Sequence, residues 1–255
     1  LPPATLSTEE RMAELPYHVQ RRRGIEARVL DAIEQKDLDN HQPTPERVLR
    51  MSSIGRCPRE LWAGRNGIPE ERPFDQRVRT LFRLGHHVED LVVEHLNDAG
   101  LIVSDQQRTV DIEVGGGRLV GHIDGIVTVK GDRYLLEIKT ANERRFDQLD
   151  KDNGPGYQAW NPVYGSQLHA YMGGLGLSAA LAVVYCKNDS RIYIEKVPFD
   201  RDVFLSLLVK GQEIFEAVGA PDRPSEARSK SNSFCKWCTF NDWCWSPIRS
   251  AGFDD

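Results

Sequence analysis

The sequence predicts an α/β fold in which helices flank a mixed central sheet. Residues 75–99 carry apolar side chains at helical spacing, and this run ends at Gly100. Apolar and polar residues then alternate over residues 108–114, and glycine-containing turns at residues 115–117 and 131–132 separate further strand-like runs. Helical and strand patterns therefore follow one another along the chain, as they do in α/β folds.

The other elements follow from the same signals. Before the long helix we expect a helical lead-in, with helical stretches near residues 8–13 and 23–35, and a helix that begins near Cys57 behind Ser52 and Ser53. After it we expect a three-stranded meander, a loop long enough to be functional, and a helix, two strands and a last helix. The expected bounds are strands 108–114, 119–129 and 134–140, loop 141–162, helix 163–175, strands 181–187 and 192–197, and helix 200–218.

The composition suits one substantial core with appended terminal segments. The chain has 255 residues, of which 40% are hydrophobic. We expect a helical N-terminal region at residues 1–56, a core at 57–220 and a Cys-bearing segment at 221–255. No stretch approaches the ~18 consecutive apolar residues of a membrane span, and no secretory signal is visible, so a cytoplasmic protein without membrane contact is expected.

The charge and the glycine pattern exclude some function classes. The formal net charge is -5, which argues against holding nucleic acid by a general positive field, so any DNA binding has to be local. The glycine-rich run at residues 173–176 lacks the Rossmann spacing and follows a helix. No Walker A motif occurs either, which excludes a self-contained helicase of that class.

Two carboxylates and a lysine lie in neighbouring apolar strands. Side chains alternate along a strand, so Glu137 and Lys139 point to one face, and Asp124 lies in an adjacent strand of the meander. A surface ion pair on an edge strand is the plain alternative, but the apolar strand around the pair indicates burial, where a free charge is costly. Carboxylates suit Mg²⁺ or Mn²⁺, which promote phosphodiester hydrolysis.

With Asp124 and Glu137-x-Lys139, the sequence resembles the PD-(D/E)xK nucleases, in particular their RecB-like branch, although Ile123 replaces the proline of that name. The resemblance implies a restriction-endonuclease-like core and one or two Mg²⁺ or Mn²⁺ ions held by Asp124, Glu137 and the backbone carbonyl of Ile138. Lys139 would orient or help to deprotonate the attacking water.

Further motifs of this branch extend the resemblance. Glu89 stands four residues after a glycine on the long helix, the position that completes the metal site in these nucleases. His86 or His87 could substitute, although each could equally be a helix-surface residue. Gln167 and Tyr171 share one helix face and are similar to the Gln-x-x-x-Tyr motif that is thought to contact the substrate strand.

Five cysteines without a secretory signal favour metal ligation over disulfides. Cys186 stands alone in an apolar run and suits an ordinary buried thiol. The other four are Cys57, Cys235, Cys238 and Cys244. Four thiolates suit Zn²⁺ or a [4Fe-4S] cluster. This spacing resembles RecB-like nucleases with an iron–sulfur staple, including AddB-type nuclease domains and CRISPR-associated single-domain exonucleases, and so implies a structural [4Fe-4S] cluster.

The resemblance, which spans Cys57 to Trp245, implies a metal-dependent exonuclease that acts on DNA ends or single strands. Such enzymes serve recombination, repair, phage replication or CRISPR DNA processing, with protein partners from those pathways. Two alternatives remain open: a catalytically inactive nucleic-acid-binding protein on the same fold, and a structure- or site-specific endonuclease.

Overall fold

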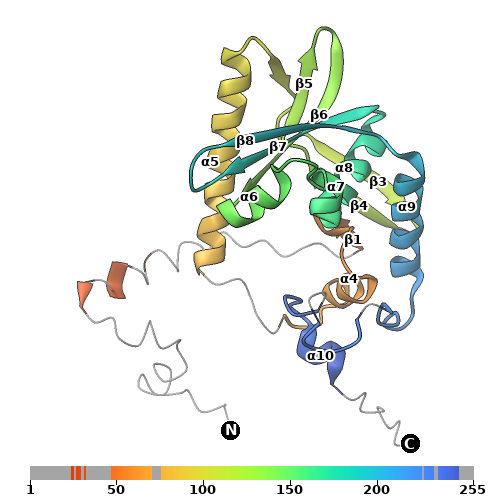
Figure 1. Cartoon of the computed structure of the whole chain (residues 1–255). Coiled ribbons are helices and arrows are strands. Elements are labelled where there is room, and N and C mark those ends of the chain that lie inside the picture. The colour runs from red at the N-terminus through yellow and green to blue at the C-terminus, as the bar shows by residue number, and fades with distance from the viewer. Residues whose placement is uncertain are drawn as a thin grey trace, which may run out of the picture. The chain divides into compact units, whose positions relative to one another are not determined.

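The structure is a computed structural model that describes residues 24–25, 27–29, 32, 47–70, 76–225, 227–232 and 235–246. The chain divides into two units, residues 1–43 with 74–81 and residues 44–73 with 82–255. The second unit contains every described strand (Figure 1). The helical stretch expected near residues 8–13, and most of the one near 23–35, lie outside the described residues.

Two mixed sheets form the second unit. One has the strand order β1-β4-β3 and the other has the order β2-β5-β6-β7-β8. The pairs β1/β4 and β6/β7 are parallel, and every other neighbouring pair is antiparallel. The predicted mixed α/β class is confirmed. The strands are β1 (Val48–Arg50), β2 (Ile102–Ser104), β3 (Thr109–Val114), β4 (Gly117–His122), β5 (Gly125–Val129), β6 (Asp132–Ala141), β7 (Ala179–Cys186) and β8 (Ile192–Pro198).

The expected single strand at residues 119–129, and with it the three-stranded meander, is wrong. β4 ends at His122 in the smaller sheet, whereas β5 begins at Gly125 in the larger one. The apolar sequence pattern hides this break, because Ile123, which lies between the two strands, is itself apolar and fully buried. The chain therefore passes from one sheet to the other at Ile123 and Asp124.

The described residues from 47 onward also contain one short 3-10 helix and seven α-helices. The expected loop at 141–162 is wrong in part, because it contains α6 and α7. The helix near Cys57 is confirmed, but Ser52 and Ser53 lie in the 3-10 helix and Cys57 itself is the N-cap. The helices are η1 (Met51–Ser53), α4 (Pro58–Arg65), α5 (Gln76–Asp98), α6 (Glu143–Leu149), α7 (Tyr157–Trp160), α8 (Pro162–Leu175), α9 (Arg201–Glu216) and α10 (Asn241–Trp245).

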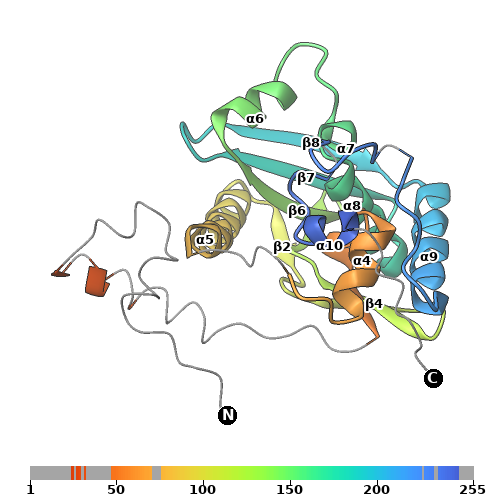
Figure 2. The same cartoon turned by 90° about the horizontal axis from the view of Figure 1, so that it is seen from below.

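The two faces of the larger sheet pack against different helices (Figures 1 and 2). Val88 and Val92 of α5 join Leu136 and Ile138 of β6 in one apolar cluster. Leu135 of β6 belongs instead to the larger cluster, which includes α8. Because side chains alternate along a strand, Glu137 and Lys139 share the face of Leu135 and point toward the helices of that larger cluster.

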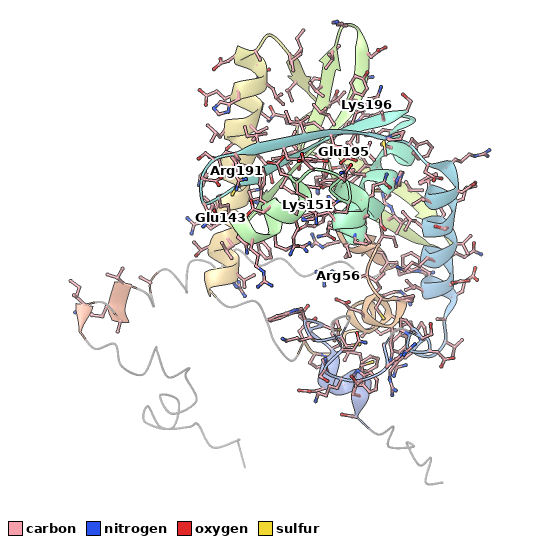
Figure 3. The ribbon with its side chains drawn as sticks, viewed as in Figure 1. Arg56, Glu143, Lys151, Arg191, Glu195 and Lys196 are labelled. Atoms are coloured by element: carbon pink, nitrogen blue, oxygen red, sulfur yellow. The ribbon has the colours of Figure 1, made fainter. Side chains whose placement is uncertain are left out.

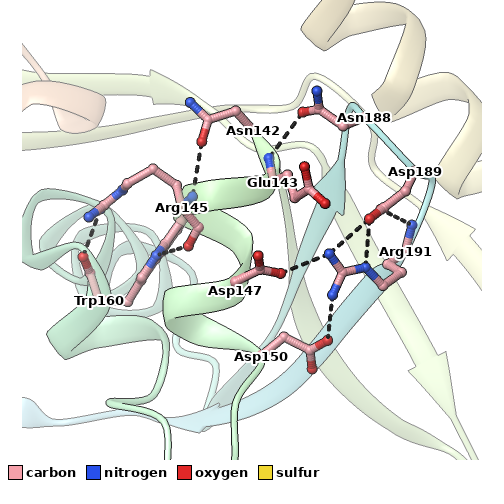
Figure 4. Close-up of polar contacts among 9 residues, drawn as sticks. All are labelled: Asn142, Glu143, Arg145, Asp147, Asp150, Trp160, Asn188, Asp189 and Arg191. Atoms are coloured by element: carbon pink, nitrogen blue, oxygen red, sulfur yellow. Dashed lines mark hydrogen bonds and ion pairs between the residues drawn. The ribbon is translucent and has the colours of Figure 1, made fainter.

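Polar contacts fasten α6 to the turn between β7 and β8 (Figure 4). The Arg191 guanidinium lies 2.8 Å from carboxylate oxygens of both Asp147 and Asp189, and the Glu143 amide donates to Asn188 over 3.0 Å. Single exposed ion pairs stabilise little, but a network with several partners fixes geometry. This network holds α6 in place directly after β6, the strand that carries Glu137. None of the described helices is long and apolar enough to cross a membrane.

Candidate active site

Asp124, Glu137 and Lys139 come together where the chain changes sheets. Glu137 is fully buried, and Nζ of Lys139 lies 2.5 Å from its Oε1. Oδ2 of Asp124 accepts a hydrogen bond of 2.6 Å from the backbone N–H of Ile138. Asp124 reaches this position because it stands between β4 and β5, next to β6. The expected neighbourhood of the three side chains is present.

Burial sets the protonation of the carboxylates. It raises the pKa of Asp124 to about 8, and the charges of Glu137 and Glu89 add to the rise. Burial also raises the pKa of Glu137, although the Lys139 ammonium opposes it. For Lys139 burial works to lower the pKa, but Glu137 and Asp124 hold it well above the ordinary value. The lysine is therefore an ammonium, whereas Asp124 keeps its proton below a pH of about 8 unless a cation displaces it.

The carboxylate oxygens suit a divalent cation. Both Oε atoms of Glu137 are buried, and among the described residues the Lys139 ammonium is the one group that pairs with them. A hard cation such as Mg²⁺ or Mn²⁺ prefers oxygen ligands and would offset the charge that burial disfavours. The donor chemistry therefore fits a metal. Within the described ranges, however, no group of three or more His, Cys, Asp or Glu side chains is arranged to hold a metal ion as it stands.

Of the three residues on the long helix that were predicted for the metal site, Glu89 and His86 lie near the carboxylates and His87 does not. Glu89 on α5 is only partly exposed and close enough to raise the pKa of both Asp124 and Glu137. Nδ1 of His86 lies 3.4 Å from Oε2 of Glu89, and both residues line the cavity described below. His87 is exposed and does not line that cavity. Of the two histidines, only His86 is therefore near the carboxylates.

Gln167 and Tyr171 of α8 are both buried and line the same cavity. A side-chain hydrogen bond joins them, while burial and the nearby Glu137 charge raise the pKa of Tyr171. Gly121 of β4 makes room for this tyrosine, because a Cβ there would lie 2.5 Å from its hydroxyl oxygen. The expected shared face of the two residues is present.

A cavity of about 1340 Å³ opens onto these groups. Its lining includes three arginines that the sequence reasoning missed: Arg47, Arg50 and Arg118. Arg47 directly precedes β1 and Arg50 is its last residue, and this strand is too short to give a periodic signal. Arg118 is in β4. Arginines in such a place can contact phosphates, although Arg118 is also paired with Asp111. The same lining also carries the carboxylates of Glu89, Asp111, Glu113 and Asp124, so the arginines lie among acidic side chains.

Two tyrosines beside Lys139 were also missed, because they lie in or next to the segment expected to be a loop. Tyr157 begins α7 and is fully buried. Nζ of Lys139 lies 5.4 Å from the ring centroid of Tyr164 on α8, a cation–π distance. The rings of the two tyrosines stack with centroids 6.3 Å apart. Aromatic rings therefore line one side of the Lys139 side chain.

Four of the cysteines gather at a second cavity, between α4 and α10. Cys57, Cys235, Cys238 and Cys244 all line it, whereas Cys186 lies apart in β7. All five are free thiols. Burial raises the pKa of Cys238 to about 12, and the neighbouring Cys57 and Cys244 contribute. The donor set suits iron or zinc, but the open volume is about 20 Å³, close to that of one water, so the side chains would have to part.

Aromatic stacking joins α4, which Cys57 caps, to α10, which contains Cys244. Figure 2 shows these two helices close together. The rings of Trp62 on α4 and Trp243 on α10 stack with centroids 6.3 Å apart. The guanidinium of Arg59 lies 4.8 Å from the centroid of the Trp243 ring. Segments at opposite ends of the sequence are thereby held together without any bond between the thiols.

The PD-(D/E)XK nuclease superfamily matches the chain over residues 28–245. The solved structure titled "Crystal structure of SSO0001" is similar with a TM-score of 0.55 and 17% identity, over 87% of this chain and 98% of that one. That likeness concerns the fold alone. No curated protein matches the chain.

Two structures of an exonuclease are more distantly similar, each with a TM-score of 0.48. LHK-Exo in complex with dAMP is 18% identical over 65% of this chain and 85% of that one. The alkaline exonuclease LHK-Exo from Laribacter hongkongensis is 16% identical over 72% of this chain and 90% of that one. Because the superfamily match covers most of the sequence, the chain belongs to the PD-(D/E)XK nuclease superfamily.

Proposed function

We propose that this nuclease is a Mg²⁺- or Mn²⁺-dependent deoxyribonuclease that digests DNA from its ends. The observation that carries the proposal is the fully buried Glu137. Among the described residues its two oxygens pair only with the Lys139 ammonium, and Asp124 is a second buried carboxylate beside it. Once Asp124 gives up its proton, the buried carboxylate pair has only one ammonium to neutralise it. A divalent cation supplies the missing charge and, when bound, lowers the pKa of a water molecule and polarises the phosphoryl oxygens.

The chain's own residues take distinct parts in this hydrolysis. Asp124 and Glu137 hold the cation, with Glu89 and the Ile138 carbonyl as the further proposed ligands. The oxygen of the attacking water forms a bond to phosphorus and its proton passes to solvent. The bond to the leaving oxygen breaks, and that oxygen takes up a proton from solvent. Because the pKa of Lys139 is held well above its ordinary value, it acts as an ammonium that orients the water and stabilises phosphoryl charge.

The position of the carboxylates supports action on a single strand or an end. Glu137 is fully buried, and the cavity that leads to the site has a volume of about 1340 Å³. That is only somewhat larger than the ~300–1,000 Å³ of typical small-ligand pockets, so it suits a few nucleotides of one strand rather than an intact duplex. Gln167 and Tyr171 line it as the proposed contacts to the strand.

We further propose that Cys57, Cys235, Cys238 and Cys244 hold a structural [4Fe-4S] cluster that ties residues 221–255 to the nuclease core at 57–220. Their shared cavity supports this assignment. Joining segments so far apart closes a long loop and so removes conformational freedom from the unfolded chain. Partner proteins of recombination or CRISPR DNA processing remain expectations from the sequence resemblance.

Two other functions are weighed against this one. An inactive DNA-binding protein on the same fold has no use for Asp124, Glu137 and Lys139 together, and all three are present. A site-specific endonuclease keeps the same chemistry but admits a continuous duplex.

The deciding experiment offers two substrates of one sequence, a linear DNA and a covalently closed circle, with Mn²⁺ present. We expect the linear DNA to shorten stepwise while the circle persists. Cutting of the circle would show an endonuclease. Loss of neither substrate, while DNA is still bound, would support the inactive binding protein.

A further inference from the structure

The hydroxyl of Tyr157 is a buried polar group next to the candidate active site that the proposed hydrolysis does not use. The residue is fully buried, and its Oη atom has no hydrogen-bond partner in the described part of the chain. A buried hydroxyl without a partner lowers stability, so its presence calls for a functional explanation. A phenylalanine would fill the same space without that cost.

The surrounding residues hold Tyr157 in one orientation. Glu195 lies on β8 (Figure 3). Its Oε2 atom accepts hydrogen bonds from the Tyr157 backbone N–H, at 2.8 Å, and from the Tyr193 hydroxyl, at 2.5 Å. The Tyr157 ring stacks on Tyr164 with an interplanar angle of 27° and contacts Trp160 at a centroid distance of 6.1 Å. Backbone and ring are therefore fixed, and the hydroxyl is fixed with them.

Tyr157 belongs to the same cluster of groups as the charged pair, because its ring stacks on Tyr164 and the Tyr164 ring lies 5.4 Å from Nζ of Lys139. Burial raises the pKa of Tyr157 well above its ordinary value, and the Glu137 charge is the next cause, with Lys139 acting in the opposite direction. The phenol consequently stays protonated. Its oxygen can accept a hydrogen bond from an ammonium, and its proton can be donated to an anion.

The Lys139 ammonium needs a second hydrogen-bond acceptor when its present partner, the Glu137 carboxylate, binds the cation. Its Nζ atom is 2.5 Å from Oε1 of Glu137, the same carboxylate that is proposed to ligate the cation. A carboxylate oxygen that turns to a cation binds the ammonium less strongly. Near Nζ the chain then offers the face of the Tyr164 ring, 5.4 Å from the centroid. Tyr157, whose hydroxyl has no hydrogen-bond partner among the described residues, stacks on that ring.

We propose that Tyr157 is a positioning residue of the nuclease site, whose hydroxyl takes over the Lys139 ammonium when Glu137 turns to the divalent cation. This inference rests on the proposed metal-dependent function. Tyr157 thereby keeps Lys139 beside the phosphoryl group and frees Glu137 for the cation. It acts through Lys139 and Glu137, and it touches neither DNA nor the reacting phosphorus.

The test compares Tyr157→Phe with Tyr164→Phe, which also removes one hydroxyl beside Lys139 but leaves the proposed acceptor in place. The first readout is Mn²⁺ binding by calorimetry, without DNA. We expect Tyr157→Phe to weaken binding about tenfold and to lower kcat about tenfold with KM for DNA unchanged, the size typical of residues that support metal ligands. Tyr164→Phe should match wild type in all three quantities.

Thermal unfolding separates a positioning role from a structural one. Because Tyr157→Phe removes an unpartnered buried hydroxyl, its melting temperature should equal or exceed that of the wild type. A clearly lower melting temperature, or Mn²⁺ binding and kcat equal to wild type, would overturn the inference. If the wild type does not digest DNA but Tyr157→Phe still binds Mn²⁺ more weakly, the nuclease proposal fails and the positioning role stands.

Discussion

Nζ of Lys139 lies 2.5 Å from Oε1 of Glu137, two residues earlier on the same face of β6. A buried ion pair of this kind is weak evidence for stability, because removing two charges from water offsets most of their attraction. Asp124 adds a second carboxylate without adding a positive charge. The cluster is therefore better explained by the binding of a cation and a phosphate than by support of the fold.

The first prediction concerns the cost of this cluster to stability. Because the pKa of Asp124 is raised to about 8, its ionised form is disfavoured in the folded protein, and stability falls as pH rises from the unfolded value of 3.8 through about 8. At pH 8 and without divalent cations, Asp124→Asn should raise the melting temperature by a few degrees, about 2–4 °C for each kcal/mol. The same variant should lose at least about 100-fold in nuclease activity.

Asp111→Asn is the matched control, since Asp111 lines the same cavity but pairs with Arg118 at an exposed position. It should change stability by less than about 0.5 kcal/mol. Scanning calorimetry at pH 8 and pH 4 checks both variants. The gain of Asp124→Asn should vanish near pH 4, and a gain that persists there contradicts the assigned cause.

The second prediction concerns the pH dependence of cation binding. A cation must displace the proton that Asp124 carries below a pKa of about 8. Mn²⁺ affinity should therefore rise by up to about tenfold per pH unit between pH 6 and 8 and then level off. Titration calorimetry in several buffers also counts the released proton. Equal affinity at pH 6 and pH 8 would show that these carboxylates are already ionised.

Much of the fold and of the catalytic group was predictable, because periodic apolar patterns and a motif on one strand are local signals. The α5 pattern and the Glu137-x-Lys139 alternation fall in this class. The break at Asp124 was not predictable, since Ile123 keeps the apolar run continuous while the backbone changes sheets. Tyr157 was missed because its role depends on neighbours from distant elements, such as Glu195 on β8.

The third prediction concerns the close contact between β4 and α8. A Cβ on Gly121 would lie 2.5 Å from Oη and 2.7 Å from Cε1 of Tyr171, so Gly121→Ala should displace the tyrosine. We expect a loss of about 1–3 kcal/mol in the free energy of unfolding, as for overpacked cores. Activity should fall as well, because Tyr171 leaves the cavity. Urea unfolding and DNA digestion measure the two effects.

Gly85→Ala supplies the control on α5, where a Cβ would meet nothing within 4 Å. Alanine favours a helix interior over glycine by roughly 0.5–1 kcal/mol, so this variant should be slightly more stable. Equal stability for the two alanine variants would contradict the steric account of Gly121.

The fourth prediction concerns the cysteines. Cys238→Ala should lower the iron content, the visible absorbance, the solubility and the melting temperature together, because the cluster is proposed to be structural. Cys186→Ala, which alters a fully buried thiol away from the second cavity, should keep the iron. Elemental analysis of protein prepared without oxygen checks both. Zinc in place of iron would overturn the cluster, and lost activity at unchanged stability would overturn its structural role.

The most direct test of the central claim uses linear DNA labelled at the 5′ or the 3′ end. Wild-type protein and Glu137→Gln are compared with Mn²⁺, after both are shown to be folded. If Glu137 holds the catalytic cation, the wild type should release the label stepwise. Glu137→Gln, which exchanges one buried oxygen for an amide nitrogen, should not release it. Equal digestion by the two proteins would contradict the account.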